Sequence, residues 1–187
     1  MSQDTTGNIN SHPPDNQPAT TYPWFRASNP VLIRTVKEEW GWLGNMAPYP
    51  LIWKEREYRT PEALFQARRF LDAGYEHIAE QIRAAKSPMA AKWIAKERQN
   101  AALVLRANRS DMNLMREILG LKVRSYPNLL NSLDQTGNRI IIEDCTFRDR
   151  GSARFWGAVL IGCDWYGENI LGELWMEIRD MHRLRQC

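Results

Sequence analysis

The chain has 187 residues and a mass of 21.8 kDa; 43% of its residues are hydrophobic, 25% are charged, and its net charge is +3. This balance is typical of one globular domain with a short extension, and it excludes a wholly disordered chain, a collagen-like chain and a bundle of membrane helices. Three scattered cysteines form neither a disulfide framework nor a zinc pattern, so we expect a cytoplasmic protein.

The first segment of the chain is polar and contains almost no apolar side chain to bury. Residues 1–22 are rich in Ser, Thr, Asn, Asp and Pro, a composition that does not offset the entropy lost on ordering. The segment also lacks the basic and apolar blocks of a secretory or transit peptide. We therefore predict a disordered tail over residues 1–22 and a folded domain over residues 23–187.

Short strands are predicted at the start of the folded domain. Residues 31–33 (Val-Leu-Ile) form one candidate strand. Residues 39–50 contain two Gly and two Pro, which indicates a loop anchored by aromatic side chains. Residues 51–53 and 57–58 are apolar or aromatic on either side of a short polar turn, so we expect a small hairpin there.

Helical patterns dominate the middle of the chain. Thr60-Pro61 and Ser87-Pro88 each place an N-cap residue before a proline, which is typical of a helix start. Ser110 is expected to cap a later helix in the same way. The resulting prediction is five helices, which begin near residues 61, 75, 88, 111 and 127.

The helix that begins near residue 88 carries an alternative. Its large apolar side chains, Met89, Trp93 and Ile94, are expected to face the core. Its lysines, Lys92 and Lys96, are expected to lie on a solvated face, although a buried lysine there would be a candidate nucleophile.

The last part of the chain combines strands with one long helix. Residues 138–142 form the clearest strand pattern, and residues 155–159 form a second candidate. A helix is expected over residues 169–185, with Asn169 as its N-cap. The predicted fold class is therefore mainly α, a single multihelical domain with a small β-sheet.

One helical face combines polar side chains with aromatic neighbours. Glu62, Gln66 and Arg69 follow an i, i+4, i+7 spacing and so share a face, which Phe65 and Phe70 flank. Glu62 also lies in the first turn, where the helix dipole favours its ionised form. The simpler alternative is a surface residue that complements the dipole and pairs with Arg69.

Two further segments are candidates for chemistry. Glu143 and Asp144 end an apolar strand, where paired acids can project into a cleft, although a turn after an edge strand is the simpler explanation of these two residues. Trp156-Gly157 permits close approach of a ligand. Gly167-Glu168-Asn169 offers a candidate anion site at a helix start, and an ordinary cap is the alternative.

Several kinds of site are missing from the sequence. The three histidines have no partner at the spacing of a metal site or a catalytic triad. The chain contains neither a P-loop nor a G-x-G-x-x-G segment. We therefore expect no metal and no cofactor.

Taken in order, these segments resemble one known family, the NADAR family, also called the YbiA-like N-glycosidases. The resemblance extends from about Trp40 to Arg179. The segments that carry it are Gly44-Asn45-Met46, Thr60-Pro61-Glu62-x-x-Phe65-Gln66-Ala67-x-x-Phe70, Ser87-Pro88-Met89-Ala90, Ile142-Glu143, Phe155-Trp156-Gly157, Gly167-x-Asn169-x-Leu171-Gly172 and Met176-Glu177-Ile178-Arg179.

The resemblance implies a mainly helical enzyme that cleaves the bond between a ribose carbon and an amine nitrogen without a metal. Substrates in the family are phosphorylated ribosylaminopyrimidine intermediates of riboflavin synthesis, or ADP-ribose attached to guanine in nucleic acid. The implied partner is therefore a small ribosyl amine phosphate or an ADP-ribosylated nucleic acid, with no membrane and no obligate protein partner.

The resemblance also assigns residues to this reaction. Cleavage of a glycosidic C–N bond develops positive charge on the ribose, which a nearby carboxylate stabilises. Glu62 is the first catalytic candidate and Glu143 the second, to orient ribose hydroxyls or assist proton transfer. The expected substrate-binding residues, which stack on the base or hold hydroxyls and phosphate, are Asn45, Phe65, Gln66, Arg69, Trp156, Gly157 and Asn169.

The sequence departs from the family at several positions. Ala63 stands where members often have His, and Arg69 and Glu168 stand where members often have Lys. A covalent lysine adduct at those two positions is therefore excluded. The Asp that members carry before the Trp-Gly pair has no clear counterpart here, and Asp149 is only a candidate for it.

Two alternatives remain open, the first of them because of these departures. One is a non-catalytic module that binds ADP-ribose or a related nucleotide. The other is a helical adaptor for nucleic acid or protein, which the mildly basic composition allows.

Overall fold

A computed structural model describes residues 22–186 of the chain, so the predicted tail lies outside the described residues except for Tyr22. The helices are α1 (Pro61–Asp72), α2 (Glu76–Ala84), α3 (Pro88–Lys96), α4 (Arg98–Ala101), α5 (Arg109–Ser125), α6 (Asn128–Asp134), α7 (Ala153–Trp156) and α8 (Ile170–Leu184), with a 3-10 turn at Gly41–Leu43. The strands are β1 (Trp24–Phe25), β2 (Val31–Ile33), β3 (Leu51–Trp53), β4 (Arg56–Tyr58), β5 (Ile141–Glu143), β6 (Val159–Ile161) and β7 (Asp164–Tyr166).

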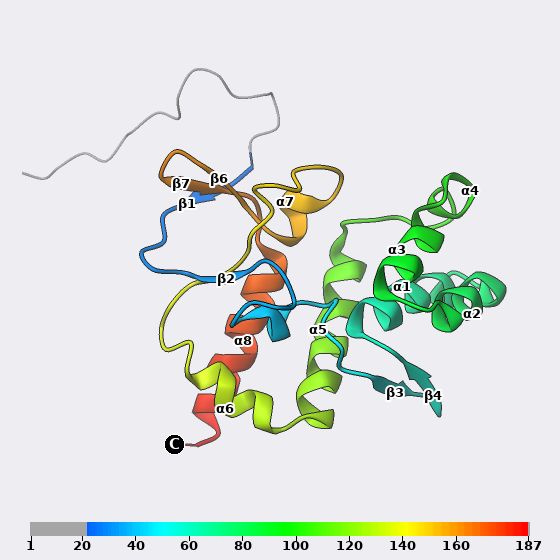
Figure 1. The fold of residues 1–187 in the computed structure, drawn as a ribbon, viewed down its shortest axis with the longest axis horizontal. Helices are drawn as coiled ribbons and strands as arrows, with labels where there is room; N and C mark the ends of the chain where they lie inside the picture. Colours follow the sequence, from blue (N-terminus) through cyan, green and yellow to red (C-terminus); the bar gives the residue numbers. More distant parts are fainter. Residues whose placement is uncertain (1–21, 187) are drawn as a thin grey trace, which may run out of the picture.

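The fold class is confirmed: the chain forms a mainly helical single domain with small sheets. The strands form a three-stranded sheet in the order β1-β7-β6, a parallel pair β2-β5, and the predicted hairpin β3-β4. Figure 1 shows α5 near the centre, with α8 on one side and α1, α2 and α3 on the other. α5 therefore lies between α8 and α1 and packs against both helices.

The predicted cap-then-proline starts are confirmed at both positions. The Thr60 hydroxyl accepts a hydrogen bond from the Ala63 N–H (3.2 Å), and the Ser87 hydroxyl accepts one from Ala90 (3.1 Å). The expected cap at Ser110 is wrong. Asn108 caps α5 instead, because its side chain accepts from the Asp111 N–H (3.0 Å) and its backbone is extended.

The expected orientation of α3 is wrong for its two largest apolar side chains. Met89 and Trp93 are exposed, whereas Ala91 and Ala95 are buried. α3 packs against α1 and α2, and small alanines allow this close approach. The long side chains therefore point away from the core.

The segment after the polar loop also differs from its prediction. Residues 155–159 were expected to form one strand, but α7 ends at Trp156 and β6 begins at Val159. Gly157 separates the two elements with extended backbone.

The main core lies between α1, α5 and α8 and includes the fully buried Trp175. The indole N–H of Trp175 donates to the carbonyl of Leu43 (2.8 Å), which fixes the loop before the hairpin. Gly172 lets α8 approach β5, since a Cβ there would lie 2.0 Å from the Ile141 carbonyl oxygen. Among the described residues, no helix has the length and apolar character needed to cross a bilayer.

Candidate functional site

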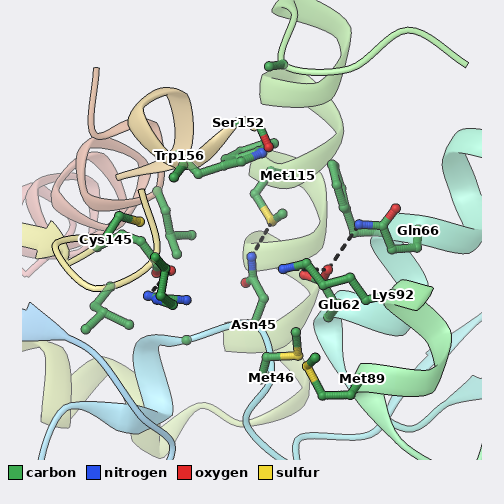
Figure 2. Close-up of a pocket in the computed structure, with 18 of the residues that line it drawn as sticks. Asn45, Met46, Glu62, Gln66, Met89, Lys92, Met115, Cys145, Ser152 and Trp156 are labelled. Carbon is green, nitrogen blue, oxygen red and sulfur yellow. Dashed lines mark hydrogen bonds and ion pairs between the residues drawn. The ribbon is translucent and has the colours of Figure 1, made fainter. Parts of the chain in front are cut away.

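A cavity of about 600 Å³ lies between α1 and α3 on one side and the segment from β5 to α7 on the other. This volume is within the usual range of small-molecule sites. Figure 2 shows Glu62, Gln66 and Lys92 facing Trp156 and Cys145, with Asn45 and Met115 between them. Seven of the nine residues predicted from the sequence line it: Asn45, Glu62, Phe65, Gln66, Arg69, Glu143 and Trp156.

Glu62 lies in the first turn of α1 with only 6% of its surface exposed. Its carboxylate accepts a hydrogen bond from the Gln66 side-chain amide (3.0 Å) and lies 3.5 Å from the Lys92 ammonium. The alternative of an exposed Glu62–Arg69 pair therefore does not describe this helix. Glu62 is instead a buried carboxylate on the cavity wall with a cation of α3 beside it.

Arg69 joins α1 to the start of α5. Its Nε donates to the Asp111 carboxylate (2.8 Å), and its Nη1 donates to the Gln66 side-chain oxygen (3.3 Å). Nη2 donates to the backbone carbonyl of Leu105. Because these contacts occupy the guanidinium, Arg69 fixes the orientation of Gln66, and through it that of Glu62.

Asn45 lies on the loop that precedes the hairpin. Its backbone carbonyl accepts from the Glu62 N–H (2.9 Å), which satisfies one of the free donors at the start of α1. Its side-chain amide donates to the Met115 sulfur (3.3 Å). The side-chain oxygen is buried with no partner among the described residues, so it remains an acceptor for a ligand.

Glu143 ends β5 and pairs with Arg148, whose Nη2 lies 2.9 Å from the carboxylate. Burial raises the pKa of Glu143, and the charge and hydrogen bond of Arg148 act in the opposite direction. The cavity therefore holds two carboxylates with different surroundings, Glu62 beside Lys92 and Glu143 beside Arg148.

Gly157 and Asn169 do not line the cavity; both support the backbone of Glu143. A Cβ on Gly157 would lie 2.1 Å from the Glu143 carbonyl oxygen, which explains the glycine. The Asn169 side chain accepts from the Glu143 N–H (3.0 Å) and donates to the Ile141 carbonyl (2.8 Å). It is therefore not the side-chain cap that the sequence predicted for α8.

The amides near these two residues are also engaged, since the Gly157 N–H donates to Ala153 and the Asn169 N–H donates to Gly157. The proposed anion site at the start of α8 therefore lacks free donors at these positions. Asp149 pairs with Arg154 (2.7 Å) and does not line the cavity.

Trp156 and Phe65 form an aromatic wall. Their ring centroids are 5.4 Å apart and their planes meet at 87°, an edge-to-face arrangement. Phe65 comes from α1 and Trp156 from the end of α7, so the contact joins the two sides of the cavity.

Most of the basic residues of the cavity were missed from the sequence. Its charged lining consists of seven basic and three acidic residues, namely Arg34, Arg69, Lys92, Lys96, Arg106, Arg148 and Arg150 with Glu62, Asp111 and Glu143. One signal was present: Met89, Lys92, Trp93 and Lys96 follow the i, i+3, i+4, i+7 spacing of one helical face. In the described part of the chain, no group of three or more His, Cys, Asp or Glu side chains is placed to hold a metal ion.

Comparison with known proteins gives a consistent result. A family model described as the NADAR domain matches residues 32–183. N-glycosidase YbiA of Shigella boydii serotype 4 (strain Sb227) is 31% identical over 152 residues, which cover 80% of this chain and 86% of that protein. N-glycosidase YbiA of Escherichia coli (strain K12) is 30% identical over the same length.

The likeness extends to three dimensions. The NMR structure of the E. coli protein YbiA matches with a TM-score of 0.65 and 26% sequence identity, and the match covers 86% of this chain and 90% of that one. The family model, the relatives and the shared fold lead to the same conclusion: this chain belongs to the NADAR domain family.

Proposed function

We propose that this chain is an N-glycosidase that hydrolyses the bond between a ribose carbon and an amine nitrogen. Its substrate would be a phosphorylated ribosyl amine, either a ribosylaminopyrimidine phosphate or ADP-ribosylated guanine. The observation that carries the proposal is the buried Glu62 carboxylate, held on the wall of a basic, aromatic-lined cavity. The names of the relatives, N-glycosidase YbiA, support the same type of reaction.

The proposed reaction breaks the C–N bond as positive charge develops on the anomeric carbon. Glu62 stabilises that charge and accepts a proton from the water that attacks the carbon. The electron pair of the broken bond passes to the amine nitrogen, which takes up a proton. Glu143 suits the role of proton donor, because burial raises its pKa above the usual range of a glutamate.

The other residues of the cavity are proposed to position the substrate and the two carboxylates. Phe65 and Trp156 offer an aromatic surface for the leaving base, and the side-chain oxygen of Asn45 accepts from a ribose hydroxyl or a base N–H. Gln66 and Arg69 hold Glu62 in place through the hydrogen bonds described above. Gly157 and Asn169 act indirectly by fixing the backbone of Glu143.

The proposed compartment is the cytoplasm, where a ribosyl amine phosphate and nucleic acid are both available. Two of the three cysteines lie in the described residues, and both Cys145 and Cys163 are unpaired there. Free thiols are typical of a reducing compartment.

The experiment that tests the proposal compares purified wild-type protein with Glu62→Gln on ADP-ribosylated guanine DNA and on ribosylaminopyrimidine phosphates. Release of the base is followed by chromatography. Glu117→Gln serves as a matched control, because its side chain on α5 is 65% exposed and does not line the cavity. We expect Glu62→Gln to lower turnover by at least about 100-fold and the control to leave it unchanged.

Two results would contradict the proposal. Turnover by Glu62→Gln at the wild-type rate would remove this residue from the reaction. Tight binding of ADP-ribose without cleavage of any ribosyl amine would instead support the non-catalytic binding module.

A further inference from the structure

Lys92 of α3 places a positive charge beside the Glu62 carboxylate. Its ammonium nitrogen lies 3.5 Å from a Glu62 oxygen, and the two side chains are 30% and 8% exposed. Figure 2 shows Lys92 and Glu62 together on one wall of the cavity. Because little water surrounds this pair, its two charges interact more strongly than a pair on the open surface would.

The other cations of the cavity do not make this contact. Three of them pair with other carboxylates: Arg34 with Asp144 (2.8 Å), Arg69 with Asp111 (2.8 Å) and Arg148 with Glu143 (2.9 Å). Within residues 22–186, the remaining three have no carboxylate oxygen within 4.0 Å, namely Lys96, Arg106 and Arg150. Among the described residues, Lys92 is therefore the cavity cation that pairs directly with Glu62.

The charge of Lys92 also acts on Glu143. Burial raises the pKa of Glu143, the charges of Arg148 and Lys92 lower it, and the negative charge of Glu62 raises it again. The neighbouring Cys145 thiol adds no charge, since burial raises its pKa to about 12. One lysine thus acts on both carboxyl groups of the cavity, on Glu62 by contact and on Glu143 at longer range.

The direction of this effect is the same at both carboxyl groups, because a nearby positive charge favours the ionised form. At Glu62 it offsets the cost of keeping a buried carboxylate ionised, together with the hydrogen bond from Gln66. At Glu143 it limits the rise in pKa that burial causes, so that the proton can still be given up. Both effects serve a reaction that needs one ionised and one protonated carboxyl group.

We propose that Lys92 is a positioning residue of the reaction, whose single charge sets the protonation states of both Glu62 and Glu143. This role rests on the proposed function, because it assigns a base and an acid to the two glutamates. Lys92 acts through the carboxyl groups and forms no bond to the ribose.

The pH dependence of kcat/KM in Lys92→Met tests this role. Methionine keeps an unbranched apolar side chain but removes the charge, so both carboxyl groups should hold their protons to higher pH. We expect the acidic limb of the profile to move to higher pH by roughly one unit, and the alkaline limb to move in the same direction by less. Lys92→Arg, which restores the charge, should return both limbs towards their wild-type positions.

Lys86→Met is the matched control, because Lys86 is exposed just before α3 and does not line the cavity. Its profile should coincide with that of the wild type. A fall in turnover at every pH in Lys92→Met, with both limbs unmoved, would leave Lys92 only a structural role and would overturn the proposal.

Nuclear magnetic resonance tests the same charge without any cleavage. The side-chain carboxyl carbons of the two glutamates are assigned by the loss of their signals in Glu62→Gln and Glu143→Gln. Both signals should titrate at higher pH in Lys92→Met than in wild type or Lys86→Met. Titration at the same pH in wild type and Lys92→Met would overturn the role of Lys92, whether or not a substrate is cleaved.

The role of Lys92 and the proposed glycosidase fail separately. If a ribosyl amine is cleaved with the same pH profile by wild type and Lys92→Met, the glycosidase stands and the role of Lys92 does not. If both carboxyl titrations move in Lys92→Met while no ribosyl amine is cleaved, Lys92 sets the two protonation states and the glycosidase fails.

Discussion

Glu62 and Glu143 are both glutamates on one cavity, but their neighbours give them different properties. Glu62 lies beside Lys92 and Gln66 at the start of a helix. Glu143 ends a strand, and burial raises its pKa while Arg148 alone pairs with it directly. Two carboxyl groups with different surroundings are what a reaction with one base and one acid requires.

Arg148→Met should change the pH dependence of the reaction. The charge and the hydrogen bond of Arg148 lower the pKa of Glu143, so their removal raises that pKa further. If Glu143 donates the proton to the leaving amine, its carboxyl group stays protonated to higher pH in the variant. The alkaline limb of the kcat/KM profile therefore moves to higher pH. The measurement is a pH–rate profile of both proteins, and an alkaline limb at the same pH in both would contradict the role of Glu143.

The loop before the β3–β4 hairpin positions Glu62 through the carbonyl of Asn45. A side chain of α5, Lys122, binds this loop. The Lys122 ammonium is fully buried, donates to the carbonyl of Trp42, and lies 4.6 Å from the centroid of the Tyr49 ring. Burial lowers the pKa of Lys122 from 10.5 to about 7. The same loop carries Asn45, whose carbonyl binds the first turn of α1.

Lys122 should make stability depend on pH in a defined direction. The unfolded chain keeps this proton up to the usual pKa of lysine, whereas the folded chain releases it near pH 7. Stability therefore rises with pH through this window, by about 2 kcal/mol between pH about 7 and pH about 9. Urea unfolding at several pH values should show this rise for wild type and for the exposed-lysine control Lys37→Met, but not for Lys122→Met.

A parallel pH dependence in wild type and Lys122→Met would contradict the assigned titration. Lys122→Met should also loosen the loop, so its KM for the substrate should increase.

Two helical glycines should respond to alanine in opposite ways. A Cβ at Gly172 would lie 2.0 Å from the Ile141 carbonyl oxygen, so Gly172→Ala forces α8 away from β5 and should destabilise by about 1–3 kcal/mol. A Cβ at Gly120 meets only the end of the Arg124 side chain at 3.2 Å, so Gly120→Ala should stabilise by up to about 1 kcal/mol. Denaturant unfolding compares the two, and stabilisation by both variants would refute the close packing of α8 on β5.

At the scale of the whole molecule, local signals in the sequence predicted the elements, and long-range packing decided the site. Thr60-Pro61 is a local cap signal, and α1 begins where it indicates. The position of Asn169 before a helix suggested a cap, but its side chain binds the backbone of β5, 26 to 28 residues earlier in the chain. No local pattern contains that contact.

The residues of α3 that line the cavity could not be predicted for the same reason, because long-range packing sets their direction. The size of Met89 and Trp93 suggested that they belong to the core, yet the alanines of α3 make the close contact with its neighbours. The direction of Lys92 and Lys96 followed from that packing, which depends on α1 and α2. The shared face of Glu62, Gln66 and Arg69 was predictable because these residues lie within about two turns of one helix.

Catalysis by Glu62 requires the ribose to lie beside its carboxylate, and a crystal structure of the protein with ADP-ribose tests this directly. We predict that the anomeric carbon of the terminal ribose contacts the Glu62 carboxylate within the cavity bounded by Trp156 and Glu143. ADP-ribose bound outside this cavity, or with its terminal ribose out of reach of both Glu62 and Glu143, would contradict the catalytic role of Glu62.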